Sequence, residues 1–308
     1  MRNKDFYANI INELKSGFPK SNFLLDEPMS KHTTFKIGGA CDIFIEPAID
    51  ELPELISRLK AETVPITVIG NGSNLLVSDA GIDGVVISFG KAASQIDVSG
   101  EKITAQAGAL LSRLANTALE NSLTGLEFAA GIPGSVGGAV YMNAGAYGGE
   151  VKMVLHSATV LTSDLQIVKR TVEQLELSYR HSKLMETSEL VLSATFVLKK
   201  GVKEQIQQTM DELKEKRISK QPLNYPSAGS TFKRPEGYFA GKLIEDAGLK
   251  GYQVGGARVS DKHCGFVINY DNATAKDVIE LMRDVDRKVF ENAGVHLEPE
   301  VRIIGRSM

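Results

Sequence analysis

The stretch Gly131–Gly149, GIPGSVGGAVYMNAGAYGG, determines how the rest of this chain is interpreted. It holds seven glycines and no lysine, arginine or acidic residue. Ordering a glycine costs more conformational entropy than ordering another residue, so an ordered group of glycines needs a physical reason. Backbone N–H groups without neighbouring Cβ atoms can approach an anion closely, and a diphosphate is a common occupant of such a nest. We therefore expect an ordered ligand-binding loop here.

A flexible linker is the alternative interpretation of this stretch. Linkers are rich in serine and other polar residues. Here Ile132, Val136, Tyr141 and Met142 separate the glycines. These apolar side chains favour a loop that is partly buried over a linker.

Length and composition narrow the class of protein. A chain of 308 residues is expected to form two or three domains. The net charge of −3 and the lack of a basic stripe argue against a nucleic-acid partner. No apolar run of about 18 residues predicts a membrane span, and the N-terminus lacks the apolar core of a signal peptide. Cys41 and Cys264 lie far apart in the sequence and outside any metal-binding spacing, which predicts two free thiols in a reducing cytoplasm.

Hydrophobic spacing predicts alternating helices and strands along most of the chain. Asp50 is expected to cap a helix that carries Leu52, Leu55, Ile56 and Leu59 on one face. The clearest helix is the last one, in which Thr274 is the N-cap, Asp277 lies at the third position and Gly294 ends the helix. Other helices are expected near residues 6–14, 110–118 and 203–219, and strands near 43–45, 66–69, 85–88, 102–107, 153–161, 190–198 and 296–305.

The segment GNGSNLL, residues 70–76, resembles a dinucleotide-binding fingerprint only in part. Gly70 and Gly72 fit the first two glycines, but Leu75 occupies the position of the third. No helical pattern follows directly, because residues 85–88 are expected to form another strand. The Rossmann interpretation therefore fails. What remains is a polar turn after a strand, which could hold phosphate or ribose or be a plain β-turn.

The residues by themselves do not identify a reaction. The five histidines have no metal-binding spacing, so a metal enzyme is not expected. Arg180, Ser230 and Glu300 lie in loops and are the candidates for chemistry. Each also has an ordinary explanation, as a surface arginine, a turn serine and a solvated carboxylate. These observations lead to an α/β protein that binds a phosphate-bearing ligand.

Six segments, taken together and in order, resemble the UDP-N-acetylenolpyruvoylglucosamine reductase (MurB) family. The resemblance extends from about His32 to Gly305, and it is closest to the shorter, type II form because no long tyrosine-bearing insertion follows SYRHS. The segments are GNGSNLL (70–76), GLEFAAGIPGSVGGAVYMNAGAYGGE (125–150), SYRHS (178–182), YPSAGSTFKRP (225–235), AGKLIEDAGLKG (240–251) and EPEVRIIG (298–305).

The resemblance implies an α+β fold in three parts. Two subdomains, residues 1–88 and 89–201, would form an FAD-binding region of the vanillyl-alcohol-oxidase (PCMH) type, which is not a Rossmann fold. Residues 202–308 would form a C-terminal α/β substrate-binding domain. FAD would be bound without a covalent link, and NADPH would be the hydride donor. A monomer is the default expectation for the oligomeric state.

The family's motifs also imply site residues. FAD would contact Gly70, Asn71, Gly72, Ser73, Asn74, Leu75, Gly131, Ile132, Pro133, Gly134, Ser135, Gly137, Gly138, Asn143 and Gly145. Lys220 resembles a lysine that binds the substrate's carboxylate or phosphate, and Tyr147 and Arg234 are further substrate candidates.

The implied reaction reduces UDP-N-acetylglucosamine enolpyruvate to UDP-N-acetylmuramate. Hydride would pass from NADPH by way of FAD to C3 of the vinyl ether, which places negative charge on C2 and the carboxylate. Arg180, in the YR motif, would stabilise that charge with its fork of donors. Glu300, in the PEV motif, would donate a hydrogen bond in its protonated form. Ser230, in the AGS motif, would protonate C2, because it is held beside a strongly basic carbon.

Two alternatives stay open. Another flavin oxidoreductase, such as an oxidase of a sugar or hydroxy acid, would share the FAD-binding segments but not SAGSTFKRP (227–235) or EPEV (298–301). A non-enzymatic nucleotide-binding homologue would be expected to lack Arg180, Ser230 or Glu300, and all three are present. The family's role in peptidoglycan precursor synthesis implies a part in cell-wall biogenesis, cell shape and cell division, in the cytoplasm.

Overall fold

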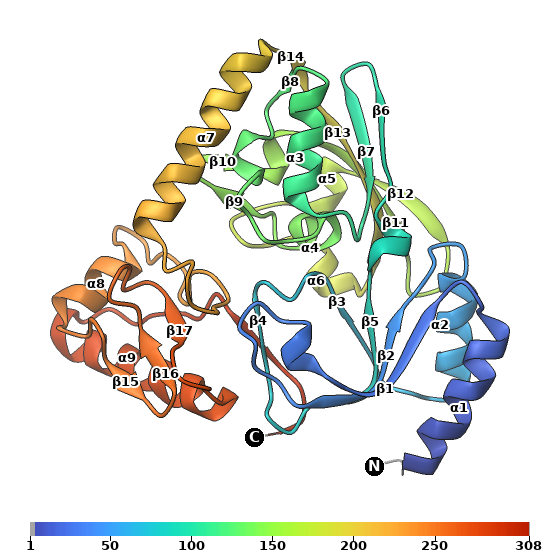
Figure 1. Cartoon of the computed structure of the whole chain (residues 1–308), viewed down its shortest axis with the longest axis horizontal. Helices are drawn as coiled ribbons and strands as arrows, with labels where there is room; N and C mark the ends of the chain where they lie inside the picture. Colours follow the sequence, from blue (N-terminus) through green and yellow to red (C-terminus); the bar gives the residue numbers. More distant parts are fainter. Residues whose placement is uncertain (1–3, 308) are drawn as a thin grey trace. The chain divides into compact units, whose positions relative to one another are not determined.

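The computed structural model describes residues 4–307, and the chain divides into two compact units. The first unit comprises Met1–Leu25, Ile43–Asn71 and Gly84–Arg217. The second comprises Asp26–Asp42, Gly72–Asp83 and Ile218–Met308. Figure 1 labels most of the helices and strands of each unit.

A five-stranded antiparallel sheet is the centre of the first unit. Its strand order is β12-β11-β13-β7-β6. The strands are β6 (Ile96–Ser99), β7 (Lys102–Gln106), β11 (Leu155–Leu161), β12 (Ile167–Thr171) and β13 (Leu190–Val197), and short pairs join β8 (Leu123–Thr124) to β14 (Lys199–Lys200) and β9 (Gly145–Ala146) to β10 (Gly149–Glu150). The predicted strands near 102–107, 153–161 and 190–198 are therefore confirmed.

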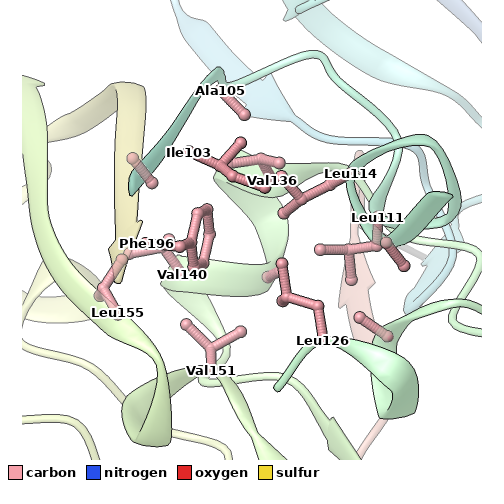
Figure 2. Packing of buried hydrophobic residues seen from close by; sticks show 14 of the residues in the cluster. Ile103, Ala105, Leu111, Leu114, Leu126, Val136, Val140, Val151, Leu155 and Phe196 are labelled. Carbon is pink, nitrogen blue, oxygen red and sulfur yellow. The ribbon is translucent and has the colours of Figure 1, made fainter. Parts of the chain in front are cut away.

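Helices cover this sheet with their apolar faces. In α3 (Leu111–Glu120) the buried residues Leu111, Leu114 and Ala118 recur at helical spacing. Figure 2 shows Leu111 and Leu114 in one cluster with Phe196 of β13, which is fully buried. Burying a side chain of this size stabilises the fold by about 1.5–3 kcal/mol. The remaining helices here are α4 (Val136–Tyr141), α5 (Val172–Leu175), α6 (Leu184–Thr187) and α7 (Lys203–Lys220).

A second core in the first unit lies under α1 (Lys4–Gly17) and α2 (Leu52–Ala61). These helices pack on a four-stranded sheet of order β1-β2-β5-β3, in which β3 and β5 run parallel. Its strands are β1 (Asn22–Pro28), β2 (Ala40–Glu46), β3 (Ile66–Ile69) and β5 (Ile82–Ser88). The predicted β–α–β order is confirmed.

The expectation that Asp50 caps α2 is wrong. The helix begins at Leu52 after Glu51, and no side chain bonds to its first amides. Asp50 instead forms an ion pair with Lys20, so its carboxylate has a charged partner in place of the helix amides. That pairing joins residues thirty positions apart, and the local sequence does not reveal it.

The second unit has its own core around α9 (Ala275–Ala293). Its other elements are α8 (Ala240–Asp246), an antiparallel sheet of β15 (Gln253–Val254), β16 (Ala257–Val259) and β17 (Val267–Asn269), and a parallel pair of β4 (Leu75–Val77) and β18 (Arg302–Ile304). The start and end of α9 are as predicted. Thr274 and Asp277 form a capping box, and Gly294 ends the helix in the left-handed conformation.

The two units divide the chain differently from the three consecutive domains expected above. Residues 72–83 belong with the C-terminal part, because β4 pairs with β18 and Leu76 lies in the core of the second unit. Phe35 and Ile37 lie in the same core. The three-domain division stays a prediction.

Within the described residues, no helix is both long and apolar enough to cross a membrane.

Candidate functional site

The glycine-rich loop of the first unit presents unpaired backbone donors. Within residues 4–307, no acceptor pairs with the amides of Gly131, Gly134 or Ser135. Ser135 is only 2% exposed, so its amide has little access to water. A buried N–H without an acceptor costs free energy, and an anion placed against these amides would remove that cost. The loop therefore fits the phosphate-binding role predicted for it.

Neighbouring backbone holds this loop in place. Asn71 Nδ2 donates to the carbonyl oxygen of Pro133 at 2.7 Å, and the Leu111 amide donates to Gly134 O at 3.0 Å. A Cβ atom at Gly70 would lie 2.7 Å from the Oγ of Ser135, so only glycine fits there without a shift. The structure thus brings Gly70 and Asn71 against the loop. Both segments are predicted to bind the same diphosphate, and this requires them to be neighbours.

Sequence reasoning did not find the short helix α4, which starts inside the glycine-rich stretch. Ser135 caps it by accepting a hydrogen bond from the Gly138 amide at 3.4 Å. Protein atoms also explain some of the glycines. A Cβ atom at Gly149 would lie 2.6 Å from the ring of Phe128, and one at Gly145 would lie 2.7 Å from Gly149 O. Internal packing therefore requires part of the glycine content, independently of any ligand.

Three predicted site residues in the first unit have left-handed backbone conformations. The φ angles are 43° at Asn143, 53° at Tyr147 and 54° at Arg180. Such conformations cost free energy in residues with side chains, and they gather at ligand and catalytic sites. Arg180 Nη2 also donates to Gly145 O at 3.2 Å, which joins the predicted catalytic arginine to the glycine-rich stretch.

Asn143 has a structural role that sequence reasoning missed. The residue is fully buried, and its Nδ2 donates to Ser178 O at 2.9 Å and to Glu150 Oε2 at 3.0 Å. Its Oδ1 accepts from the Lys152 amide at 2.9 Å. These bonds occupy the side chain and hold the segment that carries Arg180. Both side-chain N–H donors are therefore in use, and the backbone amide of Asn143 donates to Val140 O at 3.2 Å.

In the second unit the structure places Asn74 beside Glu300. Asn74 Nδ2 donates to Glu300 O at 3.1 Å, and the Arg302 amide donates to Asn74 O at 3.0 Å. The parallel pairing of β4 with β18 extends this contact and carries Leu75 opposite Arg302. At Gly72 φ is +62°, and a Cβ atom there would clash with the carbonyl oxygen of His32, so glycine is required.

In this unit the backbone of Glu300 pairs with Thr231, the residue that follows Ser230, so two predicted catalytic residues lie on paired segments. The Glu300 amide donates to Thr231 O at 2.8 Å, and the Lys233 amide donates to Glu298 O at 2.8 Å. Thr231 is buried, and its amide donates to Gly265 O at 2.9 Å. Ser230 itself is exposed, so a fixed backbone presents its hydroxyl to solvent.

Arg234 and Lys220, the predicted substrate-binding residues of the second unit, differ in their surroundings. Arg234 packs its guanidinium 3.8 Å from the centre of the Phe239 ring, and its Nε donates to Tyr238 O at 3.3 Å. Lys220 is exposed at the end of α7. Burial lowers the pKa of His263, and the positive charge of Lys220 lowers it further, so the two groups are electrostatic neighbours.

Comparison with known proteins finds relatives that match nearly the whole length of this chain. Residues 43–170 match the model of an FAD binding domain, and residues 221–304 match the C-terminal domain of UDP-N-acetylenolpyruvoylglucosamine reductase. The reductase of that name from Agathobacter rectalis is 55% identical, over 98% of this chain and 99% of its own length. The one from Lachnoclostridium phytofermentans is also 55% identical, over 97% and 98%.

A solved structure agrees with these matches. The crystal structure of UDP-N-acetylenolpyruvylglucosamine reductase (MurB) from Thermus caldophilus has a TM-score of 0.78 and 36% identity, and the match covers 92% of this chain and 98% of that one. The predicted α+β fold with an FAD-binding region and a C-terminal domain of this reductase type is thereby confirmed. The chain is a member of the UDP-N-acetylenolpyruvoylglucosamine reductase family.

Proposed function

We propose that this chain is a flavoenzyme that reduces UDP-N-acetylglucosamine enolpyruvate to UDP-N-acetylmuramate with NADPH. Family membership over almost the full length supports the reaction class. The single structural observation that supports the proposal is the backbone pairing of Glu300 with Thr231, because Thr231 directly follows Ser230 and the bond joins the segments of two proposed catalytic residues.

The first unit contains groups that fit FAD. The unpaired amides of Gly131, Gly134 and Ser135 would bind the diphosphate, and Gly70 and Asn71 would support them. FAD, when bound, supplies hydride transfer from NADPH to the substrate, which no amino-acid side chain can perform. The chain's own residues would bind FAD and the substrate, orient them, and supply the proton that the substrate needs.

Arg180 would stabilise charge on the substrate. Hydride addition at C3 leaves negative charge on C2 and the carboxylate, and a guanidinium is a permanent bidentate donor for such a group. The hydrogen bond from Arg180 to Gly145 O and the left-handed backbone at Arg180 orient the side chain before the substrate binds. Less reorganisation is then needed during the reaction.

Ser230 would donate the proton that C2 needs, and Glu300 would act as a hydrogen-bond donor to the developing charge. A serine hydroxyl is a weak acid, so its use depends on fixed placement. The buried Thr231 supplies that placement, since its backbone bonds to both Gly265 and Glu300. Lys220, Tyr147 and Arg234 are the proposed substrate-binding residues.

The proposed activity would place the chain in peptidoglycan precursor synthesis. A part in cell-wall biogenesis, cell shape and cell division follows from that activity, and we propose a cytoplasmic monomer. The experiment is an assay of NADPH oxidation with and without the enolpyruvyl substrate, in which the product is identified by mass. Oxidation that requires the substrate, with two hydrogens added to it, is expected. NADPH oxidation that the enolpyruvyl substrate does not stimulate, with oxygen as the acceptor, would contradict the proposed substrate.

A further inference from the structure

The glycine-rich loop contains no cation, although a diphosphate carries negative charge. Between Gly131 and Gly149 there is no lysine or arginine. Arg180 contacts this stretch at Gly145, and the structure places a second cation, Arg217, against its first residue. A Cβ atom built at Gly131 would lie 2.6 Å from Cδ, 3.2 Å from Nε and 3.4 Å from Nη1 of Arg217. The arginine side chain therefore lies over the space that a side chain at position 131 would fill.

Arg217 lies in the last turn of α7 and belongs to the first unit, like the loop. In sequence it stands among Lys214, Lys216 and Lys220, and the helix dipole gives sufficient reason for such a basic end. The structure separates Arg217 from the others, because it is half-buried whereas the three lysines are exposed. Position in the sequence alone did not single it out.

Among the residues that the structure describes, none forms an ion pair with the Arg217 guanidinium. No hydrogen bond joins Arg217 to another residue in that part of the chain either. Burial lowers its pKa, and the interaction with Tyr147 opposes that shift. Arginine stays protonated in proteins, so the group remains a partly desolvated cation. Such a cation costs free energy unless an anion accompanies it.

We propose that Arg217 is the cationic partner of the Gly131–Ser135 loop and that it binds the diphosphate of a nucleotide ligand. The loop supplies neutral amide donors from Gly131, Gly134 and Ser135, and Arg217 supplies the charge and the bidentate fork. Gly131 makes the arrangement possible, since a side chain there would displace the guanidinium. This inference rests on the proposed function.

Three ligands of the proposed reaction contain a diphosphate, namely FAD, NADPH and the UDP-sugar. The test measures all three with the full-length chain: FAD binding to the apoprotein, the KM for NADPH and the KM for the UDP-sugar. Arg217→Gln is expected to weaken one of them about 10- to 100-fold, the range for losing charged hydrogen bonds. The ligand that is weakened identifies the source of the diphosphate.

Matched variants separate this role from a structural one. Lys214→Gln removes the same charge from an exposed position of the same helix and should change none of the three values. Arg217→Lys should restore part of the lost affinity, because it keeps the charge but not the fork. Gly131→Ala should mimic Arg217→Gln while preserving the melting temperature, since it mainly moves a flexible side chain.

The result that would overturn the inference is unchanged binding of all three ligands in both Arg217→Gln and Gly131→Ala, with a wild type that is active. If Arg217→Gln does not fold, Gly131→Ala and Arg217→Lys decide the question in the same way. A wild-type protein that binds no flavin is a different outcome, because it would remove the proposed function itself and this inference with it.

Discussion

The amide of Glu300 donates a hydrogen bond to the carbonyl oxygen of Thr231 at 2.8 Å. This bond joins the EPEV segment, residues 298–301, to the loop that contains Ser230, which lies much earlier in the sequence. Because Thr231 is buried and also bonded to Gly265, the pairing is held by the core of the second unit. The loop is therefore part of the fold, and the backbone directly after Ser230 is held by two hydrogen bonds.

Replacing Ser230 tests the proposed proton donor. Ser230→Ala should retain bound FAD and NADPH oxidation in the first half-reaction, while reduction of the enolpyruvyl group falls about 10²- to 10⁴-fold, the usual contribution of a positioned acid. Stopped-flow absorbance separates the two half-reactions. Ser227→Ala, in the same loop, is the matched control and should be nearly normal. Full retention of substrate reduction in Ser230→Ala would remove Ser230 from the mechanism.

Replacing Arg180 tests the role of its fork. Arg180→Lys keeps the positive charge but loses the bidentate geometry and the hydrogen bond to Gly145 O, so substrate reduction should slow by about tenfold or more. Arg170→Lys is the control, because Arg170 forms a partly exposed ion pair with Glu189 and lies outside the proposed site. Normal turnover in Arg180→Lys would show that Arg180 only orders its loop.

Gly145→Ala tests the support beneath Arg180. The added methyl group would lie 2.7 Å from Gly149 O and 2.9 Å from Glu150 Cβ, so the backbone must shift. Overpacking of this kind costs about 1–3 kcal/mol, which should lower both the melting temperature and the rate of substrate reduction. Gly17→Ala, which meets no atom within 4 Å, should change neither. A Gly145→Ala protein with wild-type stability would contradict this close approach of the two backbone segments.

The α9 capping box gives a pH-dependent prediction. Burial opposes ionisation of Asp277, but hydrogen bonds from Thr274 and from the Gly256 amide outweigh it and lower the pKa of Asp277. A lowered carboxyl pKa stabilises the fold above the usual value of about 3.9, and that contribution is lost as the pH falls through the lowered pKa.

Asp277→Ala should therefore cost about 1–2 kcal/mol near neutral pH, and the difference from wild type should shrink in acid. Urea unfolding at several pH values measures both quantities. Glu280→Ala removes an exposed carboxylate from the same helix and should have little effect at any pH. A constant difference for Asp277→Ala down to strongly acidic pH would contradict the assignment.

Cys41 should be unreactive in the folded protein. The side chain is 1% exposed, and burial raises the pKa of its thiol to about 12. Almost no thiolate is then present at about pH 8, and the thiolate is the reactive form. A thiol reagent should modify Cys41 only after the denaturant unfolds the chain, as located by peptide mass mapping. Rapid labelling of Cys41 under native conditions would be inconsistent with this packing.

The sequence predicted the parts of the fold that local chemistry determines. The capping box of Thr274 and Asp277 and the left-handed Gly294 define the two ends of α9, and the structure confirms all three. Strands such as β13 were predictable because their apolar residues alternate. The Asp50–Lys20 pair and the pairing of β4 with β18 were not, since each joins distant segments.

The residues of the candidate site also fall into two groups, those that the sequence could identify and those that only the fold shows. Its residues in the glycine-rich stretch and in the SYRHS, AGS and EPEV segments were found through motifs. The occupied side chain of Asn143 and the position of Arg217 required the structure, because only the fold shows which groups already have partners. The predicted phosphate loop contains no lysine or arginine. That absence was the signal in the sequence that could have prompted a search for a cation such as Arg217.

The most direct test of the central claim is an anaerobic absorbance spectrum of the purified protein, recorded before and after NADPH and again after UDP-N-acetylglucosamine enolpyruvate. We expect a flavin spectrum that bleaches with NADPH and returns when the enolpyruvyl substrate is added. A flavin that bleaches but returns only with oxygen would contradict the proposed substrate. A protein that shows no flavin even after FAD is supplied would contradict the role of Gly131–Ser135 as a cofactor loop.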